Sequence, residues 1–211
     1  MTKRNGFTKD NITRFFEQGI DLEGRIIYIG SAAGENSKEE GDPGITFLSS
    51  EYVIKGLEVL NRVGRGKIVA VLNSVGGNEG HGFAIYDAIR ASRAPVDVEV
   101  LGSAMSMGAI ILQAGRRRLL HPHATIMIHD GTMGFDREHT RNIQRWSEYS
   151  KKTAGMAYNI FAERSGKSPA YWKGRCAHDS IYCAQGAVDV GLADAILQPT
   201  RKLPLPPTKK R

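Results

Sequence analysis

The stretch that decides the fold is Gly102-Ser103-Ala104-Met105-Ser106-Met107-Gly108-Ala109. Residues 96–101 lead into it as a β-rich run, and residues 110–114 leave it as an apolar run with helical character. The glycine and small side chains between these runs predict a tight strand-to-helix corner. A serine at such a corner exposes its hydroxyl beside the N–H groups of a helix start, which stabilise a developing negative charge. Ser106 is therefore the candidate nucleophile.

The same octet also has a purely structural interpretation. Corners rich in glycine, alanine, serine and methionine occur where a helix packs closely on a sheet, and the serine then only caps the helix. The local sequence does not separate these two interpretations. The choice depends on which other chemically suitable residues the fold brings to the same corner.

Strands and helices alternate along the first part of the chain. Strands are predicted at residues 25–30, 67–72, 96–101 and 125–128, and helices at residues 50–63 and 83–89. This alternation predicts an α/β fold built of parallel βαβ units. The strand at 67–72 is almost continuously apolar, which is typical of a sheet covered on both faces.

Three chemically suitable groups follow predicted strands. Gly76-Gly77 comes soon after the strand at 67–72, Ser106 follows the decisive corner, and His129 ends the strand at 125–128. Parallel sheets carry their binding sites at the carboxyl ends of their strands. We therefore expect these groups to meet at one edge of the sheet.

The second part of the chain has a different pattern. Residues 137–161 predict a long polar helix that projects from the core, and Gly166-Lys167-Ser168-Pro169 marks the end of one helix and the start of another. Residues 176–180 are interpreted as a short connection. Residues 186–197 predict a last helix–strand pair.

Composition and length indicate a globular protein without a membrane span. Hydrophobic residues make up 41% of the 211 residues, and no apolar run approaches the length of a membrane helix. We expect an N-terminal arm at 1–22, one domain at 23–197, and a disordered, basic, proline-rich tail at 198–211. The N-terminus has no secretory signal pattern and two cysteines give no disulfide framework, so a cytoplasmic location is expected.

The net charge of +7 raises the question of nucleic-acid binding. The run Arg116-Arg117-Arg118 and the tail contribute eight positive charges, and the rest of the chain is close to neutral. The sequence has no zinc-finger spacing and no RNA-binding aromatic motif. We therefore interpret the arginine run and the tail as solvated charge, and we expect no specific nucleic-acid site.

Two other polar groups suggest a site only weakly. His121-Pro122-His123 lacks the cysteine partners and the helical spacing of zinc ligands, so no metal and no cofactor are expected. Glu79 and His81 could form an acid–base couple after the glycine pair. Polar loop residues beside a cleft are the commoner case.

Five blocks of the sequence carry a family resemblance. In chain order they are Asn73-Ser74-Val75-Gly76-Gly77, Ala84-Ile85-Tyr86-Asp87, Gly102-Ser103-Ala104-Met105-Ser106-Met107-Gly108, Met127-Ile128-His129 and Gly191-Leu192-Ala193-Asp194-Ala195-Ile196-Leu197. In order and spacing they resemble the proteolytic subunit of the Clp protease over residues 22–197. The resemblance implies that family's crotonase-like fold, in which repeated βαβ units carry a projecting handle helix.

The resemblance also implies the residues of a serine endopeptidase. Ser106 matches the nucleophile, His129 the base and Asp179 the acid of a Ser-His-Asp triad. The backbone N–H groups of Gly77 and Met107 match the oxyanion hole. This chemistry is consistent, because a serine hydroxyl is a weak nucleophile until an imidazole, oriented by a carboxylate, takes its proton.

Assembly is a further implication of the resemblance. Family members form rings of seven subunits, commonly stacked in pairs, which enclose the active sites and cleave polypeptide substrates inside the chamber. The helix at 137–161 would be the ring-to-ring handle. An AAA+ unfoldase is the family's usual partner.

Three departures from the family pattern bear on these implications. Asp130-Gly131 stands where the family usually has Gln-Pro, which makes Asp130 a rival for the triad acid. Adjacent strand residues point to opposite faces, so Asp179 is preferred. Ala177 and His178 replace an Asp-Arg pair that the family uses between rings, which bears on double-ring stacking. The usual aromatic anchors for the unfoldase are absent at Val69, at Val71, and at Ala91 or Ser92.

Two alternative functions remain open from the sequence. A structural ring subunit with an inactive triad would fit the missing anchors. An acyl-CoA-binding enzyme of the crotonase type would use the same kind of N–H pair for an enolate. Such an enzyme needs a carboxylate base and no Ser-His pair, which Ser106 and His129 argue against.

Overall fold

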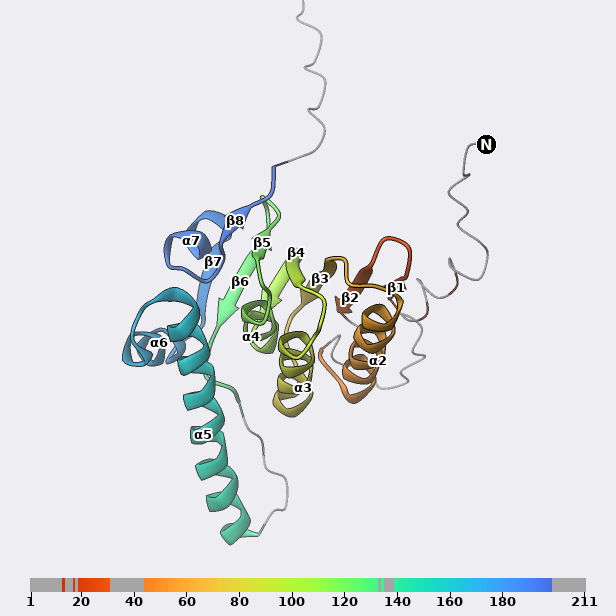
Figure 1. Ribbon diagram of the computed structural model, residues 1–211. Coiled ribbons are helices and arrows are strands. Elements are labelled where there is room, and N and C mark those ends of the chain that lie inside the picture. The colour runs from red at the N-terminus through yellow and green to blue at the C-terminus, as the bar shows by residue number, and fades with distance from the viewer. Residues whose placement is uncertain are drawn as a thin grey trace, which may run out of the picture.

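Strands and helices alternate along the computed structural model of the chain, which describes residues 13, 17, 19–30, 44–132, 134 and 139–198 (Figure 1). The strands are β1 (Ile20–Asp21), β2 (Ile26–Gly30), β3 (Ile68–Ser74), β4 (Val96–Met105), β5 (Arg118–Leu120), β6 (Thr125–Ile128), β7 (Ser180–Cys183) and β8 (Ala195–Ile196). The helices are α2 (Phe47–Val63), α3 (Glu79–Arg90), α4 (Met107–Gln113), α5 (Thr140–Ser165), α6 (Pro169–Cys176) and α7 (Ala184–Asp189). The expected N-terminal arm and basic tail lie almost entirely outside the described residues.

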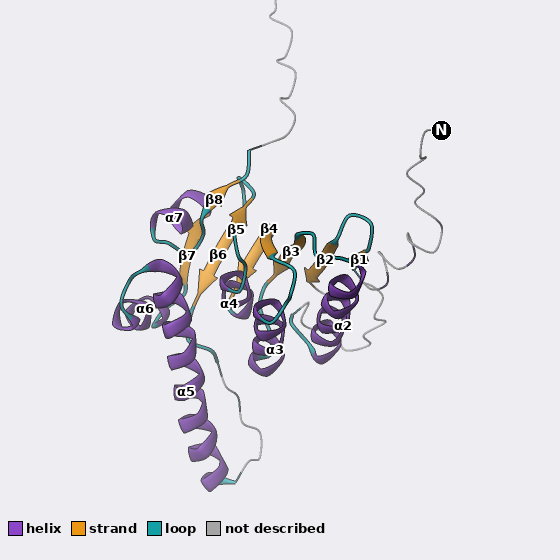
Figure 2. Ribbon diagram, in the orientation of Figure 1, coloured by secondary structure: helices purple, strands orange, loops and turns teal. Residues whose placement is uncertain are grey.

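An eight-stranded sheet forms the centre of the fold (Figure 2). Its order is β1-β2-β3-β4-β5-β8, while β6 also pairs with β4 and β7 pairs with β6. Strands β2 to β6 and β8 pair with one another in parallel, whereas β1 pairs antiparallel with β2 and β7 pairs antiparallel with β6. This arrangement confirms the α/β fold that the alternation of elements predicts.

The core lies on one face of the central strands. In β3, Ile68, Ala70 and Leu72 are fully buried, whereas Val69 and Val71 between them are only partly buried. Helices α2, α3 and α4 lie side by side along the sheet (Figure 1). The expectation that both faces of this strand are covered is wrong for the isolated chain: Tyr28, the cross-strand partner of Val71, is 37% exposed.

Helix α2 begins three residues before the predicted start because its cap lies further upstream. Thr46 and Ser49 form a capping box, in which each side chain bonds to the backbone of the other. At the opposite end, the guanidinium of Arg25 donates to the carbonyl oxygens of Leu60 at 3.0 Å and Gly64 at 3.2 Å. A cation at this position satisfies free carbonyls and complements the helix dipole.

The arginine run is not a solvated charge cluster, which corrects the sequence interpretation. Arg118 is 4% exposed, and its guanidinium donates to Gln113 Oε1 at 2.7 Å and Gly191 O at 2.8 Å, as well as to the carboxylate of Asp194. Arg116 donates from Nε and Nη2 to both carboxylate oxygens of the buried Asp97. Arg117 is exposed and fits the expectation, while Arg116 is exposed but held in this ion pair.

Strand β4 continues through Gly102 to Met105, so the predicted corner falls four residues later than the glycine. Gly102 has a φ of 102°, and a Cβ there would lie 2.6 Å from Oδ1 of Asn73. The same Oδ1 accepts a hydrogen bond from the Ser103 N–H. At this bend β4 changes neighbours: Val98–Val100 pair with β5, and Ser103–Met105 pair with β6.

Helix α5 extends away from the sheet beyond the other described elements (Figure 1). It starts and ends a few residues after the predicted 137–161 range and closes at Gly166, whose φ of 72° is left-handed. Ser168 then caps α6, with Pro169 in the first turn, which confirms the predicted helix restart. No helix in the described ranges combines the length and apolarity needed to cross a bilayer.

Candidate active site

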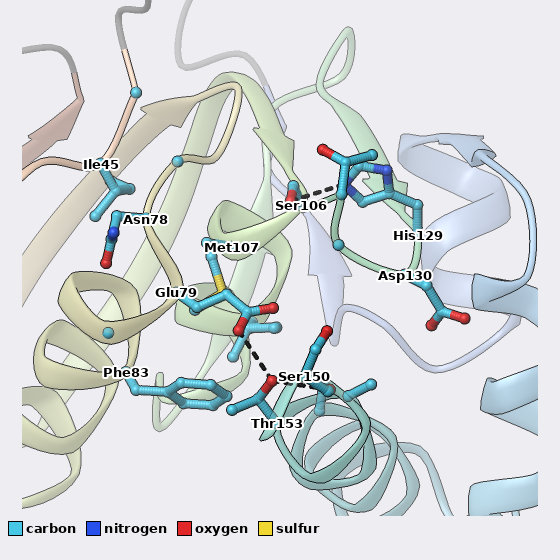
Figure 3. A pocket seen from close by; sticks show the side chains of 18 of the residues that line it. Ile45, Asn78, Glu79, Phe83, Ser106, Met107, His129, Asp130, Ser150 and Thr153 are labelled. Atoms are coloured by element: carbon cyan, nitrogen blue, oxygen red, sulfur yellow. Dashed lines mark hydrogen bonds between the residues drawn. The ribbon is translucent and has the colours of Figure 1, made fainter. Parts of the chain in front are cut away.

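Ser106 occupies the sharp turn between β4 and α4. Its φ of 50° and ψ of −120° are unusual for a residue with a side chain, and such strain is typical of functional turns. The backbone of Ser106 stands at the N-cap of α4, but its side chain makes no capping hydrogen bond. Instead Oγ lies 2.9 Å from Nε2 of His129 (Figure 3). The cap interpretation therefore does not describe this serine.

His129 and Asp179 come from neighbouring antiparallel strands. Ile128, the last residue of β6, pairs with Ser180, the first residue of β7. The next residue outward on each strand is His129 or Asp179, and Nδ1 of the imidazole lies 3.3 Å from Oδ1 of the carboxylate. Residues 176–180 are thus not a plain connection, because β7 begins there and positions the carboxylate.

Asp130 has a different partner. Its carboxylate accepts a short hydrogen bond from the Tyr158 hydroxyl, and its N–H donates to the carbonyl of Cys176 at 2.7 Å. Burial, together with the hydrogen bond to Asp130, raises the pKa of Tyr158. Figure 3 shows the Asp130 side chain directed away from Ser106. The carboxylate that lies within reach of the His129 imidazole is that of Asp179.

The glycine pair lies directly against this corner. An isolated parallel bridge joins Gly77 to Ile45, in which Ile45 donates to Gly76 O and accepts from the Asn78 N–H at 2.9 Å. This pattern uses the groups on either side of Gly77 and leaves its own N–H outside the bridge. The N–H of Met107 belongs to the first residue of α4 and has no acceptor within the helix.

A pocket of about 770 Å³ opens beside Ser106 and His129. Its walls come from α3, α4 and α5 and from the segments that precede α2 and follow β3 and β6. Besides the residues above it is lined by Thr46, Val75, Glu79, Phe83, Ile110, Met127, Trp146, Tyr149 and Thr153, among others. No sequence pattern indicates the contributions of α5 and of Ile45, since these depend on packing between distant segments.

The other polar residues considered from the sequence, Glu79 and His81, do not form a site together. Thr153 Oγ1 donates to Glu79 Oε2 at 2.9 Å, while His81 packs edge-on against Phe47 with ring centroids 5.6 Å apart. Glu79 and His81 thus have separate partners and do not form a couple. Within the described residues, no group of three or more His, Cys, Asp or Glu side chains is arranged to hold a metal ion.

A comparison with protein-family models agrees with this geometry. The model described as Clp protease matches residues 43–200, a range that contains Ser106, His129, Asp179 and every described residue that lines the pocket. The match covers well over half of the chain. On this evidence the chain belongs to the Clp protease family and is a peptidase related to the proteolytic subunit of that protease.

Proposed function

We propose that the chain is a serine endopeptidase in which Ser106 is the nucleophile, His129 the general base and Asp179 the residue that orients the imidazole. The observation that carries this proposal is the position of one imidazole. Its Nε2 lies 2.9 Å from Ser106 Oγ and its Nδ1 lies 3.3 Å from Asp179 Oδ1. Both nitrogens are thus within reach of the groups that a triad requires.

The reaction follows from this arrangement. Ser106 Oγ attacks the peptide carbonyl carbon as His129 takes the hydroxyl proton, and Asp179 stabilises the imidazolium that forms. The imidazolium then gives its proton to the leaving amine. A water molecule, activated by the same imidazole, hydrolyses the acyl-enzyme and restores Ser106.

The N–H groups of Gly77 and Met107 form the oxyanion hole in this proposal. Neither amide is used by the bridge or the helix next to it. Donors fixed before the reaction stabilise the developing oxyanion without reorganisation, and losing one such donor typically costs about 10²–10³ in rate.

We extend the proposal to assembly on the basis of the family match. The chain would form heptameric rings that enclose the sites and admit polypeptides, with α5 as the handle between rings. Trp146 and Tyr149 on α5 are about half exposed and pack edge to face, which suits a contact with another subunit. Val69 and Val71 leave the unfoldase partner without its usual aromatic anchors.

Labelling with a fluorophosphonate probe tests the triad. Wild type, Ser106→Ala, His129→Ala, Asp179→Ala and Asp130→Ala would be compared after a sizing column that confirms equal assembly. We expect labelling and peptide cleavage to fall by about 10⁴-fold or more in the first two variants. Asp179→Ala should also lose labelling, and Asp130→Ala should keep it.

Other outcomes would reassign the roles. Loss of labelling in Asp130→Ala, with Asp179→Ala still active, would move the acid to Asp130. An assembled wild-type protein that is not labelled would contradict the peptidase proposal and leave a structural ring subunit as the explanation.

A further inference from the structure

The pocket beside Ser106 carries the opposite charge to the chain as a whole. The chain has a net charge of +7, yet the described residues that line the pocket include two carboxylates, Glu79 and Asp130, and no lysine or arginine. Such a focused field attracts cations. The two carboxylates differ in where their side chains are directed (Figure 3).

Each of the two carboxylates accepts one side-chain hydrogen bond, but the Asp130 side chain is directed away from Ser106 (Figure 3). Asp130 holds the Tyr158 hydroxyl and packs near the buried Cys176. Glu79 accepts one hydrogen bond, from the Thr153 hydroxyl, and no lysine, arginine or histidine among the described residues forms an ion pair with it. An ionised carboxylate has about four acceptor sites, so most of those on Glu79 remain available to a ligand.

The surroundings hold the Glu79 carboxylate in a defined place. Its Oε2 bonds to α5 through Thr153, and its Oε1 faces Gly131, where a Cβ would lie only 2.9 Å away. The Thr153 hydroxyl also lies 3.0 Å from the Ser150 carbonyl. Gly131 thus provides the space that this oxygen occupies, and Glu79 points into the pocket from the first turn of α3 (Figure 3).

The apolar walls of the pocket suit an aliphatic side-chain stem. Met107, Phe83 and Ile110 line the pocket, and Trp146 and Tyr149 line it from α5. Long basic side chains bury their methylene groups on apolar surface and pair the charged end with a carboxylate or an aromatic ring. Lysine and arginine combine these two properties.

We propose that Glu79 determines specificity by binding a lysine or arginine side chain of the substrate, on the residue that supplies the carbonyl of the cleaved bond. The inference rests on the proposed function. The carbonyl held between Ser106 and the N–H of Gly77 belongs to that residue, and Glu79 follows Gly77 by two positions. The side chain of that residue is therefore the one that enters the pocket.

A structural role for Glu79 makes a different prediction. An acidic residue in the first turn of α3 stabilises the helix, and the bond to Thr153 ties α3 to α5. Glu79→Gln keeps the length of the side chain and an acceptor for Thr153 but removes the charge. Glu79→Lys reverses the charge. A structural role would lower activity on every substrate alike.

The test measures kcat/KM for three fluorogenic peptides that differ only in the residue before the cleaved bond, which is arginine, leucine or glutamate. The proteins are full-length wild type, Glu79→Gln, Glu79→Lys and the control Glu51→Gln, whose carboxylate pairs with Lys55 on α2 outside the pocket. Fluorophosphonate labelling of each protein reports on Ser106 independently of the peptide.

We expect wild type and Glu51→Gln to prefer the arginine peptide. Glu79→Gln should lower kcat/KM for that peptide about ten- to a hundredfold, as for a lost charge-assisted hydrogen bond, with little change for leucine. Glu79→Lys should favour the glutamate peptide, with labelling retained.

Two kinds of failure are distinguishable. A wild type that is labelled but prefers leucine, or a Glu79→Gln variant that slows all three peptides equally, would overturn the specificity inference alone. A wild type that is neither labelled nor active on any peptide would overturn the proposed function, and this inference with it.

Discussion

Gly76 leaves no room for a side chain beside Ser106. A Cβ on Gly76 would lie 2.6 Å from the Cβ of Ser106 and 2.9 Å from the carbonyl oxygen of Met105. The φ of Gly76 is 108°, which residues with side chains rarely adopt. The loop after β3 and the turn after β4 therefore hold each other in place, and this contact sets where the Gly77 N–H stands relative to Ser106.

Replacing Gly76 with alanine should disable the site. The strained backbone costs about 1–3 kcal/mol, and the contact must push Ser106 away from His129. Because displacements of about 1 Å can cost about a hundredfold in rate, we expect fluorophosphonate labelling to slow by about that factor.

The matched control is Gly155→Ala in α5. A Cβ there meets nothing within 4 Å, and alanine is the better helix former by about 1 kcal/mol. This variant should label normally and unfold at equal or higher temperature. Unchanged labelling in Gly76→Ala would show that the two loops do not constrain each other.

The arginine run predicts unequal effects from equal substitutions. Arg118→Met removes a buried guanidinium that donates to Gln113, Gly191 and Asp194, and leaves Asp194 with the backbone N–H of residue 118 and the more distant Arg164. We expect a loss of about 2–4 kcal/mol in the free energy of unfolding, measured by urea titration. Arg117→Met, at the exposed neighbour, should change it by less than about 0.5 kcal/mol. Equal effects would mean that the Arg118 network contributes nothing.

Acid should destabilise the fold through Asp97. Burial alone would raise the pKa of Asp97, but the hydrogen bonds and charge of Arg116, with the charge of Lys67, outweigh it and hold the pKa below its ordinary value. A carboxyl whose folded pKa is lowered stabilises the fold above its unfolded pKa of about 3.9, and loses this contribution as the pH falls through the folded value. The free energy of unfolding should therefore fall as the pH drops below about 4.

Asp97→Asn tests this origin of acid sensitivity. The variant should be less stable than wild type by about 1–3 kcal/mol at pH 7 and should lose less stability on acidification. Glu58→Gln, in an exposed pair with Arg62, serves as the control and should follow wild type. An Asp97→Asn profile parallel to wild type at all pH values would exclude Asp97 as the source.

The two cysteines should differ sharply in reactivity. Burial raises the pKa of the Cys176 thiol to about 12, with a further contribution from the Asp130 carboxylate, whereas Cys183 is exposed on β7. At pH 8 a thiol with that pKa is only about 10⁻⁴ ionised, and the thiolate is the reactive form.

A thiol reagent should therefore modify one cysteine in the folded protein and two in denaturant. Cys183→Ser should abolish the fast reaction, and Cys176→Ser should leave it intact. Fast reaction at two sites in the folded wild type would contradict the burial of Cys176.

The sequence predicted those features that depend on local pattern. Apolar runs marked β3, β4 and β6, and the glycines and Ser106 marked the turns between them. Ser106 and His129 could be predicted as site residues because each directly follows a strand that the sequence pattern indicates. Gly166 and Pro169 fixed the helix restart, since φ preferences act locally.

Features that depend on contacts between distant segments could not be predicted from the local sequence. Asp179 has no local signal, and only the family spacing pointed to it. Strand β7 is short, and its extended conformation depends on its pairing with β6. The bonds from Arg118 to Asp194 and from Thr153 to Glu79 join segments more than 70 residues apart, so charge alone suggested a solvated surface for the arginine run.

Because β4 pairs first with β5 and then with β6, the candidate catalytic residues come from two parts of the sheet. Ser106 directly follows β4, whereas His129 follows β6 and Asp179 precedes β7, so the antiparallel pairing of β6 with β7 holds these two residues together. The two parts are joined by three paired positions of β4 and β6 and by the hydrogen bond from the Ser106 N–H to Met127 O. Sliding the β6–β7 strand pair along β4 would break the serine–imidazole contact while the imidazole–carboxylate contact stays intact, so the pairing of β4 with β6 is where a movement of the fold would change the reactivity of the Ser106 hydroxyl.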